Sequence, residues 1–217
     1  MMDTLTLVIG NRNYSSWSLR PWILAQHLGI SLQVIRIVLD TPDFREQALR
    51  YSPTGRVPVL VQDNLAIPES LAIMEYLSEI ADGRGWPADP AERARARALA
   101  NEMHGGFGAL RHAYPMNIRA RERKVPMSTA LAGDIERIDA IFASAGRSGS
   151  EWLFGRYSIA DAMFLPVALR FQTYGTTGLS REAQRYCTTL CTDPCAASWI
   201  MAAEQETESS EHEEVGR

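Results

Sequence analysis

A break rich in glycine, proline and aspartate divides this sequence into two unlike parts. It runs "DGRGWPADP" over residues 82–90. Segments of strand and helix character alternate before it, whereas the residues after it show helical patterns only. Strands followed by a run of helices indicate an α+β chain of two domains. We therefore expect a mixed-sheet domain over residues 1–82 and an all-helical domain over residues 91–207, with the break as their linker.

The first part gives the order β-α-β-α-β-β-α. A β-α-β start predicts a parallel strand pair, and a hairpin adds antiparallel strands, so the sheet should be mixed. The expected segments are a strand at 4–9, a helix from about Ser18 to Leu28 with Pro21 in its first turn, a strand at 31–39, a short helix opening at Thr41 or Pro42, a hairpin turning near Asp63–Asn64, and a helix at 70–81 capped by Ser70.

The second part gives three clear helical patterns, at residues 91–114, 127–145 and 159–173, and two weaker ones at 181–192 and 195–206. The stretch "HGGFG", 104–108, places three glycines in the first of them. Glycine disfavours a helix interior, so we expect a kink or close helix packing there. "SIAD", 158–161, has the capping-box pattern that opens a helix.

Charge is concentrated at the C-terminus. The formal net charge is −4, but residues 204–217 alone hold six glutamates against one arginine. The remaining chain is nearly neutral, which gives no support for a nucleic-acid partner. We expect the acidic tail, residues 208–217, to be disordered.

No apolar run approaches the ~18 residues of a membrane span, and the N-terminus has no signal-peptide pattern. The sequence therefore predicts no membrane association and a cytoplasmic location. The three cysteines, Cys187, Cys191 and Cys195, are odd in number and lie late in the chain, which argues against a disulfide framework. With no histidine near them in the sequence, we interpret them as structural thiols and expect no metal.

Four motifs in order resemble the glutathione transferase family. They are "SSWSLR" at 15–20, "RVPVL" at 56–60, "ESLAIMEYL" at 69–77 and "SIADAMFLP" at 158–166. Each is weak alone, but together and at these separations they are strong, and they cover nearly the whole chain. The N-terminal motif looks most like that of the serine-type classes, such as the zeta class.

The resemblance implies that the first domain is thioredoxin-like and holds a glutathione site, with glutathione as co-substrate. The bond between Val57 and Pro58 is expected to be cis, so that the Val57 backbone pairs with the extended tripeptide like an added strand. Glu69 and Ser70, at a helix N-terminus, would bind the ammonium and carboxylate of the γ-glutamyl group. Arg56 could reach the glycyl carboxylate.

By motif position, Ser15 is the expected catalytic residue, with Ser16 as the alternative. A serine hydroxyl would donate a hydrogen bond to the glutathione thiolate, which favours the charged form and lowers the thiol pKa. Tyr14 is a rival hydroxyl. Arg20 is expected in the first helix as a structural residue.

A second-substrate pocket is expected between the domains, lined by Tyr14, Trp17, Phe107, Arg111 and Tyr114, with His104 as a further candidate from the helix at 91–114. The resemblance implies a small hydrophobic electrophile there, a homodimer and a role in detoxification. Conjugation, peroxidase and isomerase reactions all stay open. Trp17 stands where zeta enzymes have cysteine, which puts maleylacetoacetate isomerase activity in doubt. The alternative is a non-catalytic binding or stress-response protein on the same scaffold. A thiol oxidoreductase is disfavoured, since the serine turn offers no cysteine.

Overall fold

A four-stranded mixed sheet forms the first domain. The computed structural model describes residues 5–146 and 150–217. The strands are β1 (Thr6–Ile9), β2 (Gln33–Arg36), β3 (Val59–Gln62) and β4 (Leu65–Pro68), in the spatial order β2-β1-β3-β4. β1 and β2 are parallel, and the other two pairs are antiparallel. The mixed sheet predicted from the sequence is confirmed.

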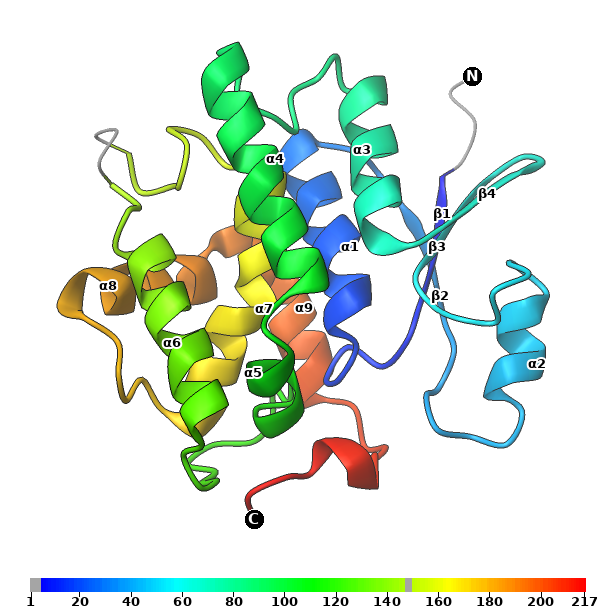
Figure 1. Ribbon diagram of the computed structural model, residues 1–217. Coiled ribbons are helices and arrows are strands. Elements are labelled where there is room, and N and C mark those ends of the chain that lie inside the picture. The colour runs from blue at the N-terminus through cyan, green and yellow to red at the C-terminus, as the bar shows by residue number, and fades with distance from the viewer. Residues whose placement is uncertain (1–4, 147–149) are drawn as a thin grey trace.

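Helices cover both faces of this sheet (Figure 1). α1 (Ser16–Leu28) and α3 (Ser70–Ile80) pack on one face, and α2 (Phe44–Leu49) lies on the other. Successive strand residues point to opposite faces. Leu7 accordingly joins the core with α1 and α3, while Val8 packs in a separate cluster with Ala48 of α2.

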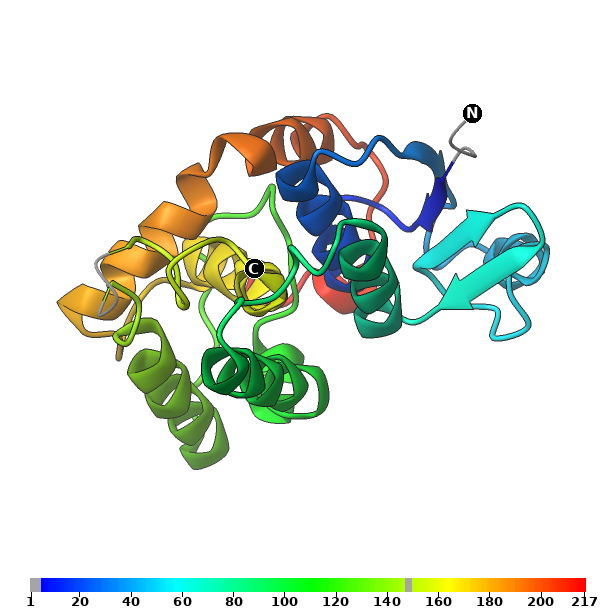
Figure 2. The same cartoon turned by 90° about the horizontal axis from the view of Figure 1, so that it is seen from above.

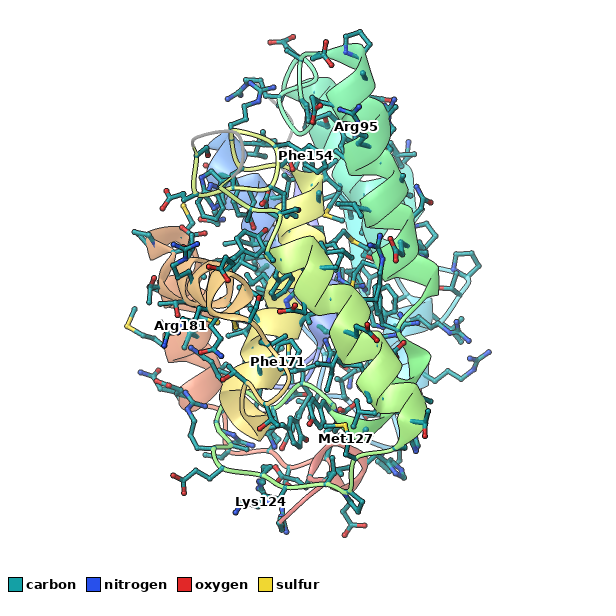
Figure 3. The ribbon with its side chains drawn as sticks, turned by 60° about the vertical axis from the view of Figure 1, so that its left-hand side comes forward. Arg95, Lys124, Met127, Phe154, Phe171 and Arg181 are labelled. Carbon is teal, nitrogen blue, oxygen red and sulfur yellow. The ribbon has the colours of Figure 1, made fainter. Side chains whose placement is uncertain are left out.

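The second domain is helical, as predicted. α7 lies at its centre, with other helices around it (Figure 2). All residues of α7 except Gln172 are buried, and α7 packs against α1, α4 and α8. One connected core therefore joins both domains. Phe171 points inward among these helices, whereas Arg95 and Arg181 lie on the outside (Figure 3). The helices are α4 (Pro90–Gly105), α5 (Gly108–Ala113), α6 (Thr129–Phe142), α7 (Ile159–Tyr174), α8 (Arg181–Thr192) and α9 (Pro194–Glu204).

The pattern over 91–114 is broken into two helices at the predicted glycine cluster. α4 ends at Gly105, and α5 begins at Gly108. A Cβ at Gly106 would lie 2.6 Å from the carbonyl oxygen of Glu102, so the close approach there requires glycine. Phe107 has a left-handed backbone, with φ of 57°. Because of this break, the residues of α5 do not continue the face of α4, as they would in one continuous helix.

The C-terminal tail differs from the sequence expectation of disorder. It lies against the body and contains a short 3-10 helix, η1 (Glu211–Glu213). Glu208 pairs with Arg36 at 2.7 Å, and Glu214 pairs with Arg123 at 2.7 Å. The acidic residues of the tail thus face arginines of the body, which offsets the charge repulsion on which the expectation rested.

Glu206 links this tail to the loop before α1. Its carboxylate, 6% exposed, accepts hydrogen bonds from the backbone N–H groups of Arg12 at 2.9 Å and Asn13 at 3.1 Å.

Replacing Glu206 with alanine should lower the free energy of unfolding by about 1–3 kcal/mol, because two N–H groups lose their acceptor. Urea denaturation measures the change. Glu204→Ala is the control: that carboxylate is half exposed and pairs with Arg121 at 3.9 Å, so a change below ~0.5 kcal/mol is expected. Equal effects of the two substitutions would contradict the prediction.

All three cysteines are free thiols, two of them buried and Cys195 half-buried. The fold places His27 close to Cys195, although the two residues are far apart in the sequence. His27 Nε2 lies 2.6 Å from Asp193 Oδ2, and His27, Asp193 and Cys195 place their ligand atoms within 4.8 Å of one another. The short contact joins α1 to the turn between α8 and α9.

Within residues 5–146 and 150–217, none of the helices combines the length and apolar character needed to cross a membrane.

Candidate functional site

A cavity of about 740 Å³ opens where the sheet, α3 and α4 meet. It brings together every residue that the sequence predicts for glutathione binding, along with Trp17. Three further residues in its wall, Arg45, Thr54 and Pro68, were not predicted as site residues, whereas His104 was a candidate for the second-substrate pocket. The lining residues are Trp17, Arg45, Thr54, Arg56, Val57, Pro58, Pro68, Glu69, Ser70 and His104.

Val57 presents free backbone groups to this cavity. The Val57–Pro58 bond is cis, as the resemblance implies. Val57 comes just before β3 and lies outside the strand ladder. Within the residues that the structure describes, its N–H and C=O have no hydrogen-bond partner. An unpaired donor and acceptor on one residue are what an extended peptide needs for strand-like pairing.

Glu69, and not Ser70, is the N-cap of α3. Its carboxylate accepts from the N–H of Leu71 at 3.1 Å and of Ala72 at 3.2 Å, and the Ser70 hydroxyl donates to it at 3.0 Å. Ser70 is the first helical residue. Glu69 has φ of 85°, an unusual value for a residue other than glycine. His104 Nδ1 lies 3.6 Å from Glu69 Oε1. The end of α3 therefore offers the cavity a carboxylate, a hydroxyl and a helix dipole.

The serine turn starts α1 two residues earlier than expected, so Pro21 falls in the second turn of the helix. Ser15 is the N-cap, but its side chain does not cap the helix. The Ser15 and Ser18 hydroxyl oxygens lie 2.7 Å apart, and Ser18 accepts from the N–H of Gly10 at 3.2 Å. Ser18 can then donate its proton to Ser15, which leaves the Ser15 proton available to another acceptor. Ser16 accepts from Arg170 Nη2 at 3.3 Å.

Three residues predicted for the second-substrate pocket lie elsewhere. The Tyr14 hydroxyl donates to Glu214 at 2.8 Å and accepts from Arg119 at 3.0 Å, so it faces the tail. Phe107 packs edge-on against Phe164 in the core. Tyr114 is buried and stacks on Tyr174, with ring centroids 4.5 Å apart. The break between α4 and α5 explains why Phe107 and Tyr114 lie in the core and not in the predicted pocket.

Trp17 lies among basic side chains. Its ring centroid is 4.2 Å from the Arg20 guanidinium and 5.5 Å from that of Arg111, and His104 packs on its edge. Arg20 is completely buried. Burial, with the nearby charges of Arg170 and Arg111, holds the pKa of Arg20 well below its usual range. Arg111 thus lies beside Trp17, which lines the cavity, but does not itself line it, whereas Arg170 is a residue that the sequence analysis missed. A charged residue within the apolar run of α7, "FLPVALRF", was the signal for it.

Comparison with known proteins points to one family. The family "Glutathione S-transferase, N-terminal domain" matches residues 14–80. Maleylacetoacetate isomerase of Rattus norvegicus is 26% identical over 158 residues, which cover 71% of this chain and 72% of that protein. Maleylacetoacetate isomerase of Rhizobium meliloti is 52% identical over 52 residues, covering 24% of each chain.

Solved structures extend the likeness over both domains. A glutathione transferase homologue from Burkholderia, solved with bound glutathione, superposes with a TM-score of 0.72 at 22% identity and covers 94% of this chain and 100% of its own. The Tau class enzyme of mango, Mangifera indica, gives 0.73 at 17% identity, covering 93% and 96%. At these identities the superposition shows the fold. The family match over residues 14–80, the related sequences and the shared fold together make this chain similar to the glutathione S-transferases over both domains.

Proposed function

We propose that the protein is a glutathione-dependent transferase. The observation that carries the proposal is the cavity in which the unpaired Val57 backbone, the Glu69–Ser70 helix end and Arg56 meet beside the serine turn. These groups match the charges and the peptide backbone of glutathione. Relatives named glutathione S-transferase, maleylacetoacetate isomerase and dichloromethane dehalogenase support an enzyme of this family.

Glutathione would lie stretched along the cavity. Its cysteinyl backbone pairs with the N–H and C=O of Val57. The γ-glutamyl ammonium faces the Glu69 carboxylate. The γ-glutamyl carboxylate takes the Ser70 hydroxyl, whose proton turns to it from Glu69, at the positive end of the α3 dipole. The glycyl carboxylate lies near Arg56, with Arg45 as a second cation in the wall.

The thiol sulfur would then lie at the serine turn. Ser15 donates a hydrogen bond to the thiolate, and the N-terminus of α1 adds a favourable dipole, so the thiol pKa falls toward neutrality. Ser16 remains the alternative donor. The thiolate attacks an electrophile held between the domains, and much of the rate gain comes from thiolate stabilisation and from holding the two reactants together.

Titration calorimetry with glutathione, followed by turnover of 1-chloro-2,4-dinitrobenzene and cumene hydroperoxide, tests the function. Saturable binding with turnover of either electrophile supports the transferase. Binding without turnover of either favours the alternative, a non-catalytic binding protein. An absence of binding at millimolar glutathione would remove the proposal.

Glu69→Gln should raise the KM for glutathione by about 10-fold, since the amide keeps the cap oxygen but loses the charge that faces the ammonium. Steady-state kinetics at varied glutathione measure it. Glu79→Gln, an exposed site at the other end of α3, is the matched control and should leave KM unchanged. A Glu69→Gln protein with the wild-type KM would remove Glu69 from the ammonium site.

Two expectations from the family resemblance remain proposals. A homodimer would cover apolar side chains such as Leu65, which is 46% exposed at the β3–β4 hairpin. Analytical ultracentrifugation measures the oligomeric state. A cytoplasmic location fits three free cysteines, because a reducing compartment keeps thiols unpaired.

A further inference from the structure

Two arginines are buried with most of their hydrogen-bonding groups unused. Arg20 on α1 is 0% exposed, and Arg170 on α7 is 4% exposed. Among the residues that the structure describes, no acceptor bonds Nε, Nη1 or Nη2 of Arg20, or Nε or Nη1 of Arg170. Within the described part of the chain, the pair forms one hydrogen bond, from Arg170 Nη2 to Ser16 at 3.3 Å. Five buried guanidinium nitrogens thus lack a partner.

Such an arrangement is costly without an anion. Buried charges in proteins are normally paired, and an uncompensated one costs several kcal/mol. The half-buried Arg111 brings a third positive charge to the same place, and its guanidinium lies 5.5 Å from the Trp17 ring centroid. Burial lowers the pKa of Arg170 to about 10, so this side chain is still charged at neutral pH.

The described residues do not supply the missing anion. Over residues 5–146 and 150–217, no carboxylate oxygen lies within 4.0 Å of an Arg20 or Arg170 nitrogen. Glu69 is the nearby carboxylate that favours the charged form of Arg20, but it caps α3. Glu213, in the C-terminal tail, likewise favours the charged form of Arg170, but the two side chains do not form an ion pair. The guanidinium groups are therefore available to a ligand.

The cluster lies beside the expected position of the sulfur. Arg170 contacts Ser16, the neighbour of Ser15. Trp17 lines the cavity and covers the Arg20 guanidinium at 4.2 Å. The charges of glutathione are already matched by Arg56, Glu69 and Ser70 elsewhere in the cavity. An anion held at the cluster therefore belongs to the second substrate.

We propose that Arg20, Arg111 and Arg170 bind a carboxylate of the electrophile, close to the carbon that the thiolate attacks. This inference rests on the proposed transferase function and replaces the expected purely hydrophobic electrophile with an anionic one. Because Ser15 and Ser16 are adjacent in the chain, the carboxylate and the reacting carbon lie only a few bonds apart. Trp17 lines the cavity and covers the Arg20 guanidinium, so the carboxylate reaches Arg20 only if the Trp17 indole is displaced.

A matched pair of electrophiles tests the proposal: 2-chloro-5-nitrobenzoate, with the carboxylate next to the reacting carbon, and 2-chloro-5-nitrobenzamide. In both, the thiolate forms a carbon–sulfur bond, chloride leaves with its electron pair, and the thiol proton goes to solvent. The wild type should prefer the benzoate in kcat/KM. Arg170→Met should lose about 10- to 100-fold on the benzoate, the range for a charge-assisted hydrogen bond, and clearly less on the benzamide.

Arg181→Met is the control, because Arg181 is exposed at the start of α8 (Figure 3), and it should keep the wild-type ratio. If Arg170→Met does not fold, Arg111→Met at its half-buried site takes its place. An unchanged ratio would overturn the proposal. So would an equal loss on both electrophiles with a higher pKa of the bound thiol, because the cluster would then serve the thiolate.

A binding measurement separates this inference from the transferase proposal. Calorimetry with 3-nitrobenzoate and 3-nitrobenzamide, in the presence of S-methylglutathione, needs no turnover. The wild type should bind the benzoate at least about 10-fold more tightly, and Arg170→Met should lose that preference. Equal affinities would show the inference wrong even in an active enzyme. A benzoate preference without turnover would support the anion site and count against the transferase.

Discussion

In a Ser15→Ala protein, kcat/KM for glutathione conjugation is expected to fall by about 100-fold, the typical loss for one preorganised donor to a developing anion. In the proposed reaction the glutathione thiolate is the nucleophile, and the Ser15 hydroxyl is the donor to it. Without this bond the pKa of the bound thiol rises, so less thiolate is present at any pH below it. The acid limb of the pH profile of kcat/KM should therefore move to higher pH, while the KM for glutathione changes little.

Ser16→Ala is the matched control, because Ser16 is the next residue and its hydroxyl contacts Arg170. A smaller loss without the shift of the acid limb is expected. If the larger loss and the shift appear in Ser16→Ala, Ser16 is the donor. If neither substitution moves the acid limb, the serine turn does not stabilise the thiolate.

The residues proposed to bind glutathione could be located from the sequence because they belong to short motifs. Val57 and Pro58 lie next to β3, and Glu69 and Ser70 start α3, so local pattern was enough to place them. The exact cap was not predictable, since Glu69 adopts a positive φ that its residue type rarely takes.

The other side of the site could not be predicted, because it depends on contacts between distant segments. Arg170 reaches Ser16 across 154 positions of the chain. Phe107 and Tyr114 were placed in the pocket on the assumption of a continuous helix, and the break at Gly106 turns them into the core. The position of the tail likewise depends on distant pairs such as Arg36 with Glu208.

Replacing Asp161 with alanine should give the largest loss of stability, about 3–5 kcal/mol. The "SIAD" motif predicts a cap, but the structure gives Asp161 a wider role. Its fully buried carboxylate accepts from the N–H of Leu153 at 3.0 Å, the N–H of Ser158 at 2.9 Å, and the hydroxyls of Ser158 at 2.8 Å and Tyr186 at 2.6 Å. Alanine leaves two buried N–H groups without acceptors, at ~1–3 kcal/mol each, and loses charge-assisted bonds as well.

Urea denaturation at neutral pH measures this loss, and Tyr186→Phe provides the graded control. That substitution removes one of the four donors and should cost about 1–2 kcal/mol. The loss of stability for Asp161→Asn should fall between those of Asp161→Ala and Tyr186→Phe, because the amide NH₂ group then faces two donors. An Asp161→Ala protein as stable as Tyr186→Phe would contradict the carboxylate's role as the acceptor for all four donors.

The pH dependence of the Asp161→Asn effect is a further check on the same carboxylate. Burial raises the pKa of Asp161 above 3.8, although its four donors act in the opposite direction. The folded state therefore binds this proton more tightly than the unfolded chain does, and ionisation costs the wild type stability as the pH rises through the folded pKa. The Asp161→Asn protein lacks this titration, so its deficit in the free energy of unfolding, relative to the wild type, should be larger at about pH 4 than at pH 7. A deficit that grows with rising pH would mean that hydrogen bonding, and not burial, sets the folded pKa of Asp161.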